Sequence, residues 1–312
     1  MSKLVSLAVH GGSGTVLREL LSAEDEAKYL TGLNDALAAG SQVLDAGGSA
    51  IDAVTAAVVV LEDCPMFNAG RGAVYAANGK QEMDASIMEG LTRNAGAVSM
   101  ISGIKNPIKL ARTIMEKSDF VFLAGEGAME FAKAHNMTFE PESYFHNEFR
   151  YQQWLDIKDT NRTQLDHAHL KDEKFGTVGA VALDVHGNLA AATSTGGMTN
   201  KAFGRIGDSP MIGAGTYANN ATCAVSCTGS GEYFIRGVAA YDVSCLMEYK
   251  GLTLQEACDT VVHDRLLALG GDGGLIAVDA NGNVALPFNT DGMYRGYYKE
   301  GVKCAEIFKN KT

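Results

Sequence analysis

The chain has 312 residues, of which 46% are hydrophobic and 20% charged, a composition that supports one large or two ordinary globular domains and excludes a disordered chain. Its formal net charge of -11 argues against a nucleic-acid-binding or anionic-membrane surface. The longest apolar run, residues 53–61, is too short to cross a bilayer, and residues 1–12 lack the apolar core of a signal peptide. We therefore expect a cytoplasmic protein whose cysteines are reduced, with no membrane or nucleic-acid partner.

The first half of the chain predicts strands and helices in consecutive groups. Residues 4–9 predict a strand, residues 24–46 a helix that ends at Gly47, and residues 50–62 a second helix capped by Ser49. Further strands are expected at 73–76, 83–88, 95–100 and 120–123, and further helices at 108–115 and 126–134.

The second half follows a polar segment at about residues 156–174. Two apolar strands, 178–184 and 189–194, are joined by a short turn and lead into a glycine-rich loop, 196–215. The later elements are expected as strand 221–226, helices 232–248 and 254–268, and strands 275–279 and 283–287, whereas residues 296–312 carry no clear pattern. Strands in hairpin pairs and helices in consecutive pairs indicate sheets packed between helix layers, not a doubly wound sheet.

Thr177 stands where the polar segment meets the first of these two apolar strands. If the Gly176–Thr177 bond were cut, Thr177 would carry a nucleophilic hydroxyl and a free amine on one residue. The same Gly-Thr step is also typical of an ordinary strand start, because threonine is a common strand residue. The pattern at Thr177 therefore needs support from the rest of the chain.

That support comes from six motifs, which occur at residues 9–14 (VHGGSG), 67–72 (FNAGRG), 176–184 (GTVGAVALD), 194–197 (STGG), 204–210 (GRIGDSP) and 228–232 (TGSGE). In these motifs and in their order, the chain resembles the plant-type L-asparaginases, also called isoaspartyl or β-aspartyl peptidases, of the N-terminal nucleophile hydrolases. The resemblance runs from the first strand to about Tyr294.

The resemblance implies an α+β fold, a four-layer αββα sandwich whose two subunits arise from one self-cleaving precursor. Residues 1–176 would form the α subunit, with about 156–176 as a flexible linker, and residues 177–312 the β subunit. It also implies that two such αβ units associate as (αβ)2.

The resemblance further implies the roles of individual residues. Thr177 would be the nucleophile, with its own α-amine, of pKa about 7.7–8.0, as the general base. Thr195 would assist self-cleavage, and the hydroxyl of Thr228 with the backbone of Gly229 would form an oxyanion hole. The substrate would be bound by Arg205, Asp208, Thr228, Gly229, Gly231 and Asn68.

Arg205 would bind the substrate α-carboxylate and Asp208 its α-ammonium, although an Arg-x-x-Asp spacing also suits a salt bridge within the loop. Thr228 could equally cap the helix that follows it. No cofactor is required for the chemistry. A structural sodium ion is implied, held by the main-chain carbonyl groups of Leu61, Glu62, Cys64, Phe67, Ala69 and Arg71.

The function implied is hydrolysis of L-asparagine to L-aspartate and ammonia, and of β-aspartyl (isoaspartyl) dipeptides. Two alternatives remain open. One is a glycosylasparaginase-type amidohydrolase, which the lack of a secretion signal disfavours. The other is a relative that binds a ligand but does not cleave itself. Whether the Gly176–Thr177 bond is intact or cleaved distinguishes such a relative from the enzyme.

Overall fold

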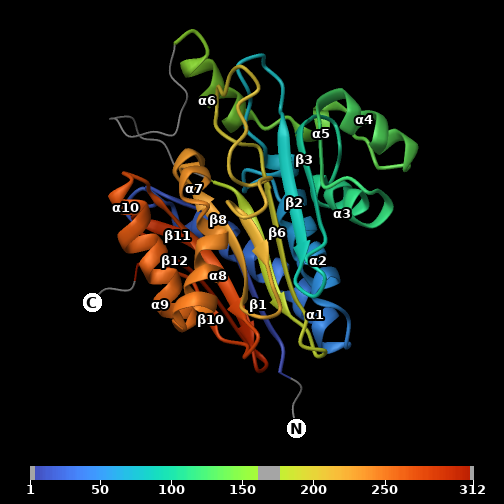
Figure 1. Cartoon of the computed structure of the whole chain (residues 1–312). Helices are drawn as coiled ribbons and strands as arrows, with labels where there is room; N and C mark the ends of the chain where they lie inside the picture. Colours follow the sequence, from blue (N-terminus) through green and yellow to red (C-terminus); the bar gives the residue numbers. More distant parts are fainter. Residues whose placement is uncertain (1–3, 161–175, 310–312) are drawn as a thin grey trace.

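The computed structural model describes residues 4–160 and 176–309, and within them the chain forms two β-sheets with helices packed on both (Figure 1). The larger sheet has the strand order β12 (Val302–Phe308), β11 (Gly292–Lys299), β1 (Ser6–Gly14), β5 (Val178–Leu183), β6 (Leu189–Thr195), β2 (Met83–Glu89), β3 (Ala95–Ile101) and β4 (Phe122–Ala124). The smaller sheet has the order β10 (Val284–Ala285), β9 (Gly273–Asp279), β8 (Cys223–Gly229) and β7 (Thr216–Ala218). The α+β class expected from the sequence is confirmed.

The central strands of the larger sheet are buried on both faces, because their side chains alternate between two cores. On β5, Ala180 and Ala182 belong to the core shared with the helices, and Val181 belongs to the core shared with the smaller sheet. A strand buried on both faces reads as a continuous apolar run, as residues 178–183 do.

Helices cover the outer side of each sheet, and Figure 1 shows α8–α10 and α1–α2 on different sides of the strands. The first core is covered by α1 (Ala23–Asp45), α2 (Ala50–Asp63) and α3 (Pro107–Lys117). The second is covered by α8 (Ala239–Lys250) and α9 (Leu254–Asp259), which continues through a π-helical turn, Thr260–Arg265, into α10 (Leu266–Ala268). The other helical segments are a 3-10 turn (Gly70–Gly72), α4 (Gly125–Ala134), α5 (Glu142–Phe145), α6 (Glu148–Ile157) and α7 (Gly231–Gly237).

The hairpin of β5 and β6 is held in register by its turn. Asp184 Oδ1 accepts hydrogen bonds from the backbone N–H groups of His186 and Asn188, at 2.9 and 3.0 Å. Its other oxygen accepts from the N–H of Ala50, at the start of α2, so the hairpin is also tied to the helix layer. The resulting register pairs Val178 with Ser194 and therefore brings the residues just beyond them, Thr177 and Thr195, to the same end of the sheet.

Most expected elements are present with shifted ends, but two expectations are wrong. Residues 73–76 form no strand; they are buried without ladder pairing, and a turn closes from Ala76 to Lys80. The single helix expected at 232–248 breaks at Val238, whose φ is 48°, because the next turn is tied to the loop before β7 through Ala240 and Tyr241. The helix α6 extends to Ile157, where the linker is expected to begin.

Elements that the sequence did not indicate are α5, α6, β7, β11 and β12, the last two from a segment without a clear apolar pattern. Most of the expected linker, residues 161–175, lies outside the described residues. Within the described residues, no helix is long and apolar enough to cross a membrane.

Candidate active site

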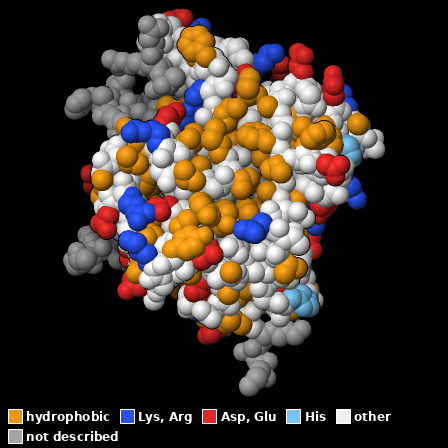
Figure 2. All heavy atoms as spheres, viewed as in Figure 1, with side chains coloured by type: hydrophobic (Ala, Val, Ile, Leu, Met, Phe, Trp, Pro, Cys, Tyr) orange, Lys and Arg blue, Asp and Glu red, His pale blue; other side chains and the backbone are white. Residues whose placement is uncertain are grey.

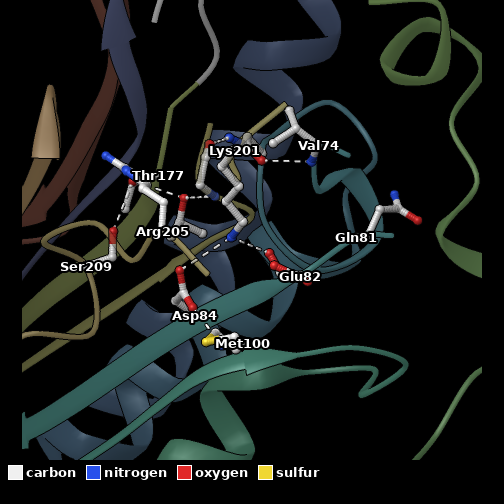
Figure 3. Close-up of polar contacts among 12 residues, drawn as sticks. Val74, Gln81, Glu82, Asp84, Met100, Thr177, Lys201, Arg205 and Ser209 are labelled. Carbon is white, nitrogen blue, oxygen red and sulfur yellow. Dashed lines mark hydrogen bonds and ion pairs between the residues drawn. The ribbon is translucent and has the colours of Figure 1, made fainter. Parts of the chain in front are cut away.

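Thr177 lies at the end of β5, almost fully buried, with its hydroxyl between two others (Figure 3). Its Oγ1 lies 3.2 Å from Thr195 Oγ1 at the end of β6 and 3.1 Å from Ser209 Oγ in the loop before β7. Thr195 Oγ1 also accepts a hydrogen bond from the N–H of Gly197, at 2.9 Å, which fixes its position. Thr195 was expected beside the nucleophile, whereas Ser209 was not.

The peptide before Thr177 lies against two other segments of the chain. A Cβ atom at Gly12 of β1 would stand 2.5 Å from the backbone nitrogen of Gly176, so only glycine permits this approach. A Cβ atom at Gly176 would stand 2.8 Å from Thr228 Oγ1. The Thr228 hydroxyl is fully buried and has no hydrogen-bond partner among the described residues, so a donor is directed at the Gly176–Thr177 peptide.

The backbone beside Thr228 is held in a conformation that favours glycine. Gly229 has a φ of 150°, and a Cβ atom there would stand 2.3 Å from the carbonyl oxygen of Asp272. Ser230 next to it donates its N–H to the same carbonyl, at 3.0 Å. Thr228 itself is anchored by Ser13, whose hydroxyl donates to the Thr228 carbonyl at 3.0 Å. These contacts join the ends of β1, β8 and β9 around the site.

Arg205 does not pair with Asp208 in this structure. Its Nε and Nη2 donate to the two carboxylate oxygens of Glu232 on α7, at 2.8 and 2.9 Å. This bidentate pair holds the pKa of Glu232 below its usual value, despite the opposing effect of burial. The guanidinium is thus fixed in one orientation, and its remaining N–H groups lie next to Gly207 and Gly231. Glu232 is a residue that sequence reasoning assigned no role.

Asp208 is buried at the same place. A Cβ atom at Gly231 would stand 2.8 Å from Asp208 Oδ1 and 3.1 Å from Arg205 Nη2, so the two charged groups flank one glycine. Asp208 Oδ2 is buried without a hydrogen-bond partner among the described residues. Burial raises the pKa of Asp208 to about 7, although nearby Arg205 opposes that shift. A cation that reached this oxygen would lower that pKa again and supply the missing partner.

Asn68 supports the loop behind Thr195. Its Nδ2 donates to the carbonyl of Gly197 at 2.7 Å, and its Oδ1 accepts from the N–H of Val74 at 3.1 Å. Both bonds are to the backbone, so in this structure Asn68 shapes the site wall.

A buried ion pair that sequence reasoning missed lies behind the same loop. Lys201 Nζ donates to the carbonyl of Glu82 at 2.8 Å and lies 3.6 Å from Asp84 Oδ2 (Figure 3). Asp84 pairs with Thr195 across β2 and β6. A lysine within a glycine-rich loop gives no sequence signal of this burial, because the partner carboxylate comes from a distant strand.

His10 of β1 lies beneath the nucleophile and is completely buried. Its Nε2 lies 2.9 Å from Ser226 Oγ, and a Cβ atom at Gly179 would stand 2.5 Å from the same Nε2. Burial lowers the pKa of His10 to about 3, and a hydrogen bond with the Thr177 backbone acts in the opposite direction. The ring is therefore neutral near neutral pH and serves as a fixed hydrogen-bonding group.

This pKa predicts how the stability of the protein depends on pH. Unfolded His10 takes up a proton near its ordinary pKa of 6.5, but folded His10 stays neutral to about pH 3. The unfolded state then binds more protons, so stability is full above pH 6.5 and falls by about 1.4 kcal/mol per pH unit as the pH decreases toward 3. Urea unfolding of wild type and His10→Gln at several pH values should show this loss in wild type relative to the variant. Parallel pH curves for the two proteins would contradict the prediction.

The loop that follows α2 turns carbonyl oxygens toward its own glycines. A Cβ atom at Gly70 would stand 2.4 Å from the carbonyl oxygen of Glu62, and one at Gly72 would stand 2.0 Å from that of Phe67. The Glu62 carboxylate is engaged elsewhere, because its Oε1 accepts from Ile108 N–H and the Ser194 hydroxyl at 2.9 and 2.7 Å. The part of the chain that the structure describes contains no group of three His, Cys, Asp or Glu residues placed to hold a metal ion.

Together these elements can perform acyl transfer. An unpaired hydroxyl donor, that of Thr228, lies next to the residue that precedes the Thr177 nucleophile, and an arginine and an unpaired carboxylate flank one glycine, Gly231. A zwitterion with a carbonyl group suits this arrangement, because it offers one charge to each of the two charged side chains.

Known proteins resemble this chain along its whole length. The family model described as asparaginase matches residues 3–306. An isoaspartyl peptidase of Escherichia coli (strain K12) is 52% identical over 315 residues, which cover 100% of this chain and 98% of that protein. An isoaspartyl peptidase/L-asparaginase of Xenopus laevis is 43% identical, with 92% of this chain and 90% of that protein covered. A plant-type L-asparaginase of Pyrococcus furiosus is 43% identical, with 96% and 98% covered.

Proposed function

The chain belongs to the asparaginase family, and on that premise we propose that it is a threonine hydrolase of L-asparagine and β-aspartyl dipeptides that activates itself by cleavage at Gly176–Thr177. The observation that carries this proposal is that the Thr177 hydroxyl lies between those of Thr195 and Ser209, while the unpaired Thr228 hydroxyl lies next to Gly176, the residue before Thr177. The names of the relatives, isoaspartyl peptidase and plant-type L-asparaginase, support the same substrates.

In the self-cleavage step, Thr177 Oγ1 attacks the carbonyl carbon of Gly176 and the C–N bond breaks, which leaves an ester and a free α-amine. Water then hydrolyses the ester and releases residues 1–176 from residues 177–312 as α and β subunits. The Thr228 hydroxyl would donate to the oxyanion that forms at Gly176, since it is unpaired and lies next to that residue.

In the hydrolytic step, Arg205 binds the α-carboxylate of the substrate and Asp208 its α-ammonium, which places the β-carbonyl over Thr177 Oγ1. The α-amine takes the hydroxyl proton as Oγ1 attacks and returns it to the leaving amine or ammonia. Thr228 and the backbone N–H of Gly229 would stabilise the oxyanion, and water then hydrolyses the aspartyl ester. Gly231 and Asn68 would shape the pocket, through the close approach of Gly231 to Asp208 and the backbone bonds of Asn68.

A substrate panel tests the proposed function. Purified protein is incubated with L-asparagine, a β-aspartyl dipeptide and a glycosylated asparagine, and the released aspartate is measured. We expect turnover of the first two substrates. Turnover of the glycosylated substrate alone would favour the glycosylasparaginase alternative, and no turnover of any substrate by a self-cleaved protein would refute the proposal.

We further propose the four-layer αββα arrangement and the (αβ)2 assembly of this family. The four-layer arrangement is supported by the packing, because helices pack on each sheet and the two sheets pack against one another. Exposed apolar side chains support the (αβ)2 assembly. Figure 2 shows hydrophobic side chains gathered across one face of the molecule. The exposed large apolar side chains of the described residues include Met100, Phe203, Val238 and Tyr241. A second copy would cover this surface. Light scattering that gives the mass of one αβ unit would contradict the assembly.

We also propose a structural sodium ion in the loop from Leu61 to Arg71. The carbonyl oxygens of Cys64, Phe67 and Ala69 each accept one hydrogen bond within the loop, so each keeps a lone pair for a hard cation. Leu61, Glu62 and Arg71 would complete the set through their carbonyl groups.

Replacement of sodium by tetramethylammonium at equal ionic strength should lower the melting temperature by about 2 °C or more, because a cation that binds only the folded state stabilises it. Sodium added back should restore the original value. Melting curves that coincide in the two salts would contradict the proposal.

A further inference from the structure

We propose that Ser209 is a further catalytic residue of this site, whose hydroxyl donates a hydrogen bond to the nucleophilic Oγ1 of Thr177. The inference rests on the proposed hydrolase function. It concerns Ser209, to which the sequence analysis assigned no role. Its basis is the 3.1 Å contact between the two hydroxyl oxygens, inside a site where Ser209 is 1% exposed (Figure 3).

The direction of this hydrogen bond follows from the number of protons available. Thr177 Oγ1 has one proton, which points to Thr195 Oγ1 at 3.2 Å. Thr195 Oγ1 is an acceptor there, and it also accepts from the N–H of Gly197. With the Thr177 proton directed to Thr195, the proton in the contact between Ser209 and Thr177 comes from Ser209.

A donor at this position assists the reaction at the moment of attack. When Thr177 Oγ1 loses its proton to the α-amine, negative charge develops on that oxygen before the new C–O bond is complete. The Ser209 hydroxyl then donates to the developing charge, and such a bond strengthens as the acceptor becomes more negative. It also fixes the direction of the Oγ1 lone pair.

Ser209 is held in place by its own backbone. Its carbonyl oxygen accepts from the Ser86 hydroxyl at 2.6 Å and lies 3.3 Å from Thr216 Oγ1, and both of these residues are completely buried. Just before it, the carbonyl of Asp208 accepts from the N–H of Met211 at 2.9 Å, which closes a turn. The hydroxyl of Ser209 therefore has little freedom to leave Thr177.

The same buried network extends to His10 and the strand that follows the nucleophile. The hydroxyl of Thr216 donates to Thr193 Oγ1, which lies 2.7 Å from Ser226 Oγ, and Ser226 Oγ lies 2.9 Å from His10 Nε2. A Cβ atom at Gly179 of β5 would stand 2.5 Å from the same Nε2, so the ring lies against the strand that follows Thr177. One chain of hydroxyl groups between the two sheets thus connects the segment that contacts Thr177 Oγ1 with the His10 ring against β5.

The test compares Ser209→Ala with Ser99→Ala. Ser99 is the matched control, because its hydroxyl is also completely buried but has no hydrogen-bond partner among the described residues. We expect Ser209→Ala to lower kcat for L-asparagine by about tenfold to a hundredfold and to slow self-cleavage, with KM and the inhibition constant of L-aspartate within about threefold of wild type. Ser99→Ala should match wild type in all four quantities. Ser209→Cys, which keeps a weak donor, should give an intermediate kcat.

A kcat of Ser209→Ala within twofold of wild type would overturn the proposal. So would an equal loss of kcat and L-aspartate binding, because that pattern indicates a distorted pocket. The self-cleavage rate distinguishes a failure of the Ser209 proposal from a failure of the proposed function. If wild type cleaves itself but hydrolyses neither substrate, the proposed function fails, while the rates of self-cleavage of Ser209→Ala and Ser99→Ala still decide the role of Ser209.

Discussion

Replacement of Thr177 by alanine is expected to leave a single 33.0 kDa chain and to abolish hydrolysis of both substrates. The variant lacks the oxygen that attacks Gly176 in the precursor and the β-carbonyl in the substrate, so both reactions lose their nucleophile. Wild type should instead separate into pieces of about 19 and 14 kDa, by proportion in a chain of ordinary composition, and the smaller piece should begin at Thr177. Gel electrophoresis, N-terminal sequencing and ammonia release measure these outcomes.

Thr177→Ser is the control for this experiment, because it keeps the hydroxyl and removes one methyl group. It should retain part of the cleavage and part of the hydrolysis. Ammonia release from asparagine by Thr177→Ala would show that another group is the nucleophile. A wild-type chain that remained intact after long incubation at neutral pH would instead favour a ligand-binding relative that does not cleave itself.

Arg205→Ala is expected to spare self-cleavage and to lower kcat/KM by about a hundredfold. The precursor attacks its own Gly176 carbonyl and needs no clamp for a free α-carboxylate, whereas the substrate does. The pair with Glu232 fixes the guanidinium and leaves N–H groups beside Gly207 and Gly231, so loss of the side chain removes an oriented cation from the pocket. Steady-state kinetics and the cleavage rate are measured on the same preparation.

Arg236→Ala is the matched control, because this exposed arginine lies on the same helix as Glu232 and its loss changes the net charge equally. It should behave as wild type. Arg205→Ala should also lose its preference for substrates with a free α-carboxylate over their α-amides. Unchanged discrimination between the two would mean that Arg205 only forms a loop salt bridge with Glu232 and that the carboxylate is bound elsewhere.

Local sequence patterns predicted those parts of the fold that form through local interactions. The predicted cap Ser49 accepts a hydrogen bond from the N–H of Asp52, three residues later, and α2 begins where Ser49 indicated. The hairpin of β5 and β6 was also expected, because two apolar runs flank a short turn. In the structure, the Asp184 side chain accepts a hydrogen bond from the backbone of this turn. These features depend on residues close together in the chain, and the sequence contains that information.

Elements set by distant contacts were missed. The strands β11 and β12 were not expected. The edge strand β12 has a weak apolar pattern, since it is partly exposed and depends on pairing with β11 for its extended shape. The break between α7 and α8 at Val238 also has no local signal, because it is fixed by hydrogen bonds from the start of α8 to the carbonyls of Gly213 and Ala214.

For the site, the sequence alone determined which residue types stand at Thr177, Arg205, Asp208 and Thr228, and the resemblance of their motifs to a known family indicated their chemistry. Only the tertiary structure decided the partners: Ser209 rather than Thr195 alone beside Thr177 Oγ1, and Glu232 rather than Asp208 on Arg205. The physical reason is that a hydrogen bond depends on distance and direction in space. The strands and loops that meet at this site are brought together by burial of two cores, which no single segment of the chain specifies.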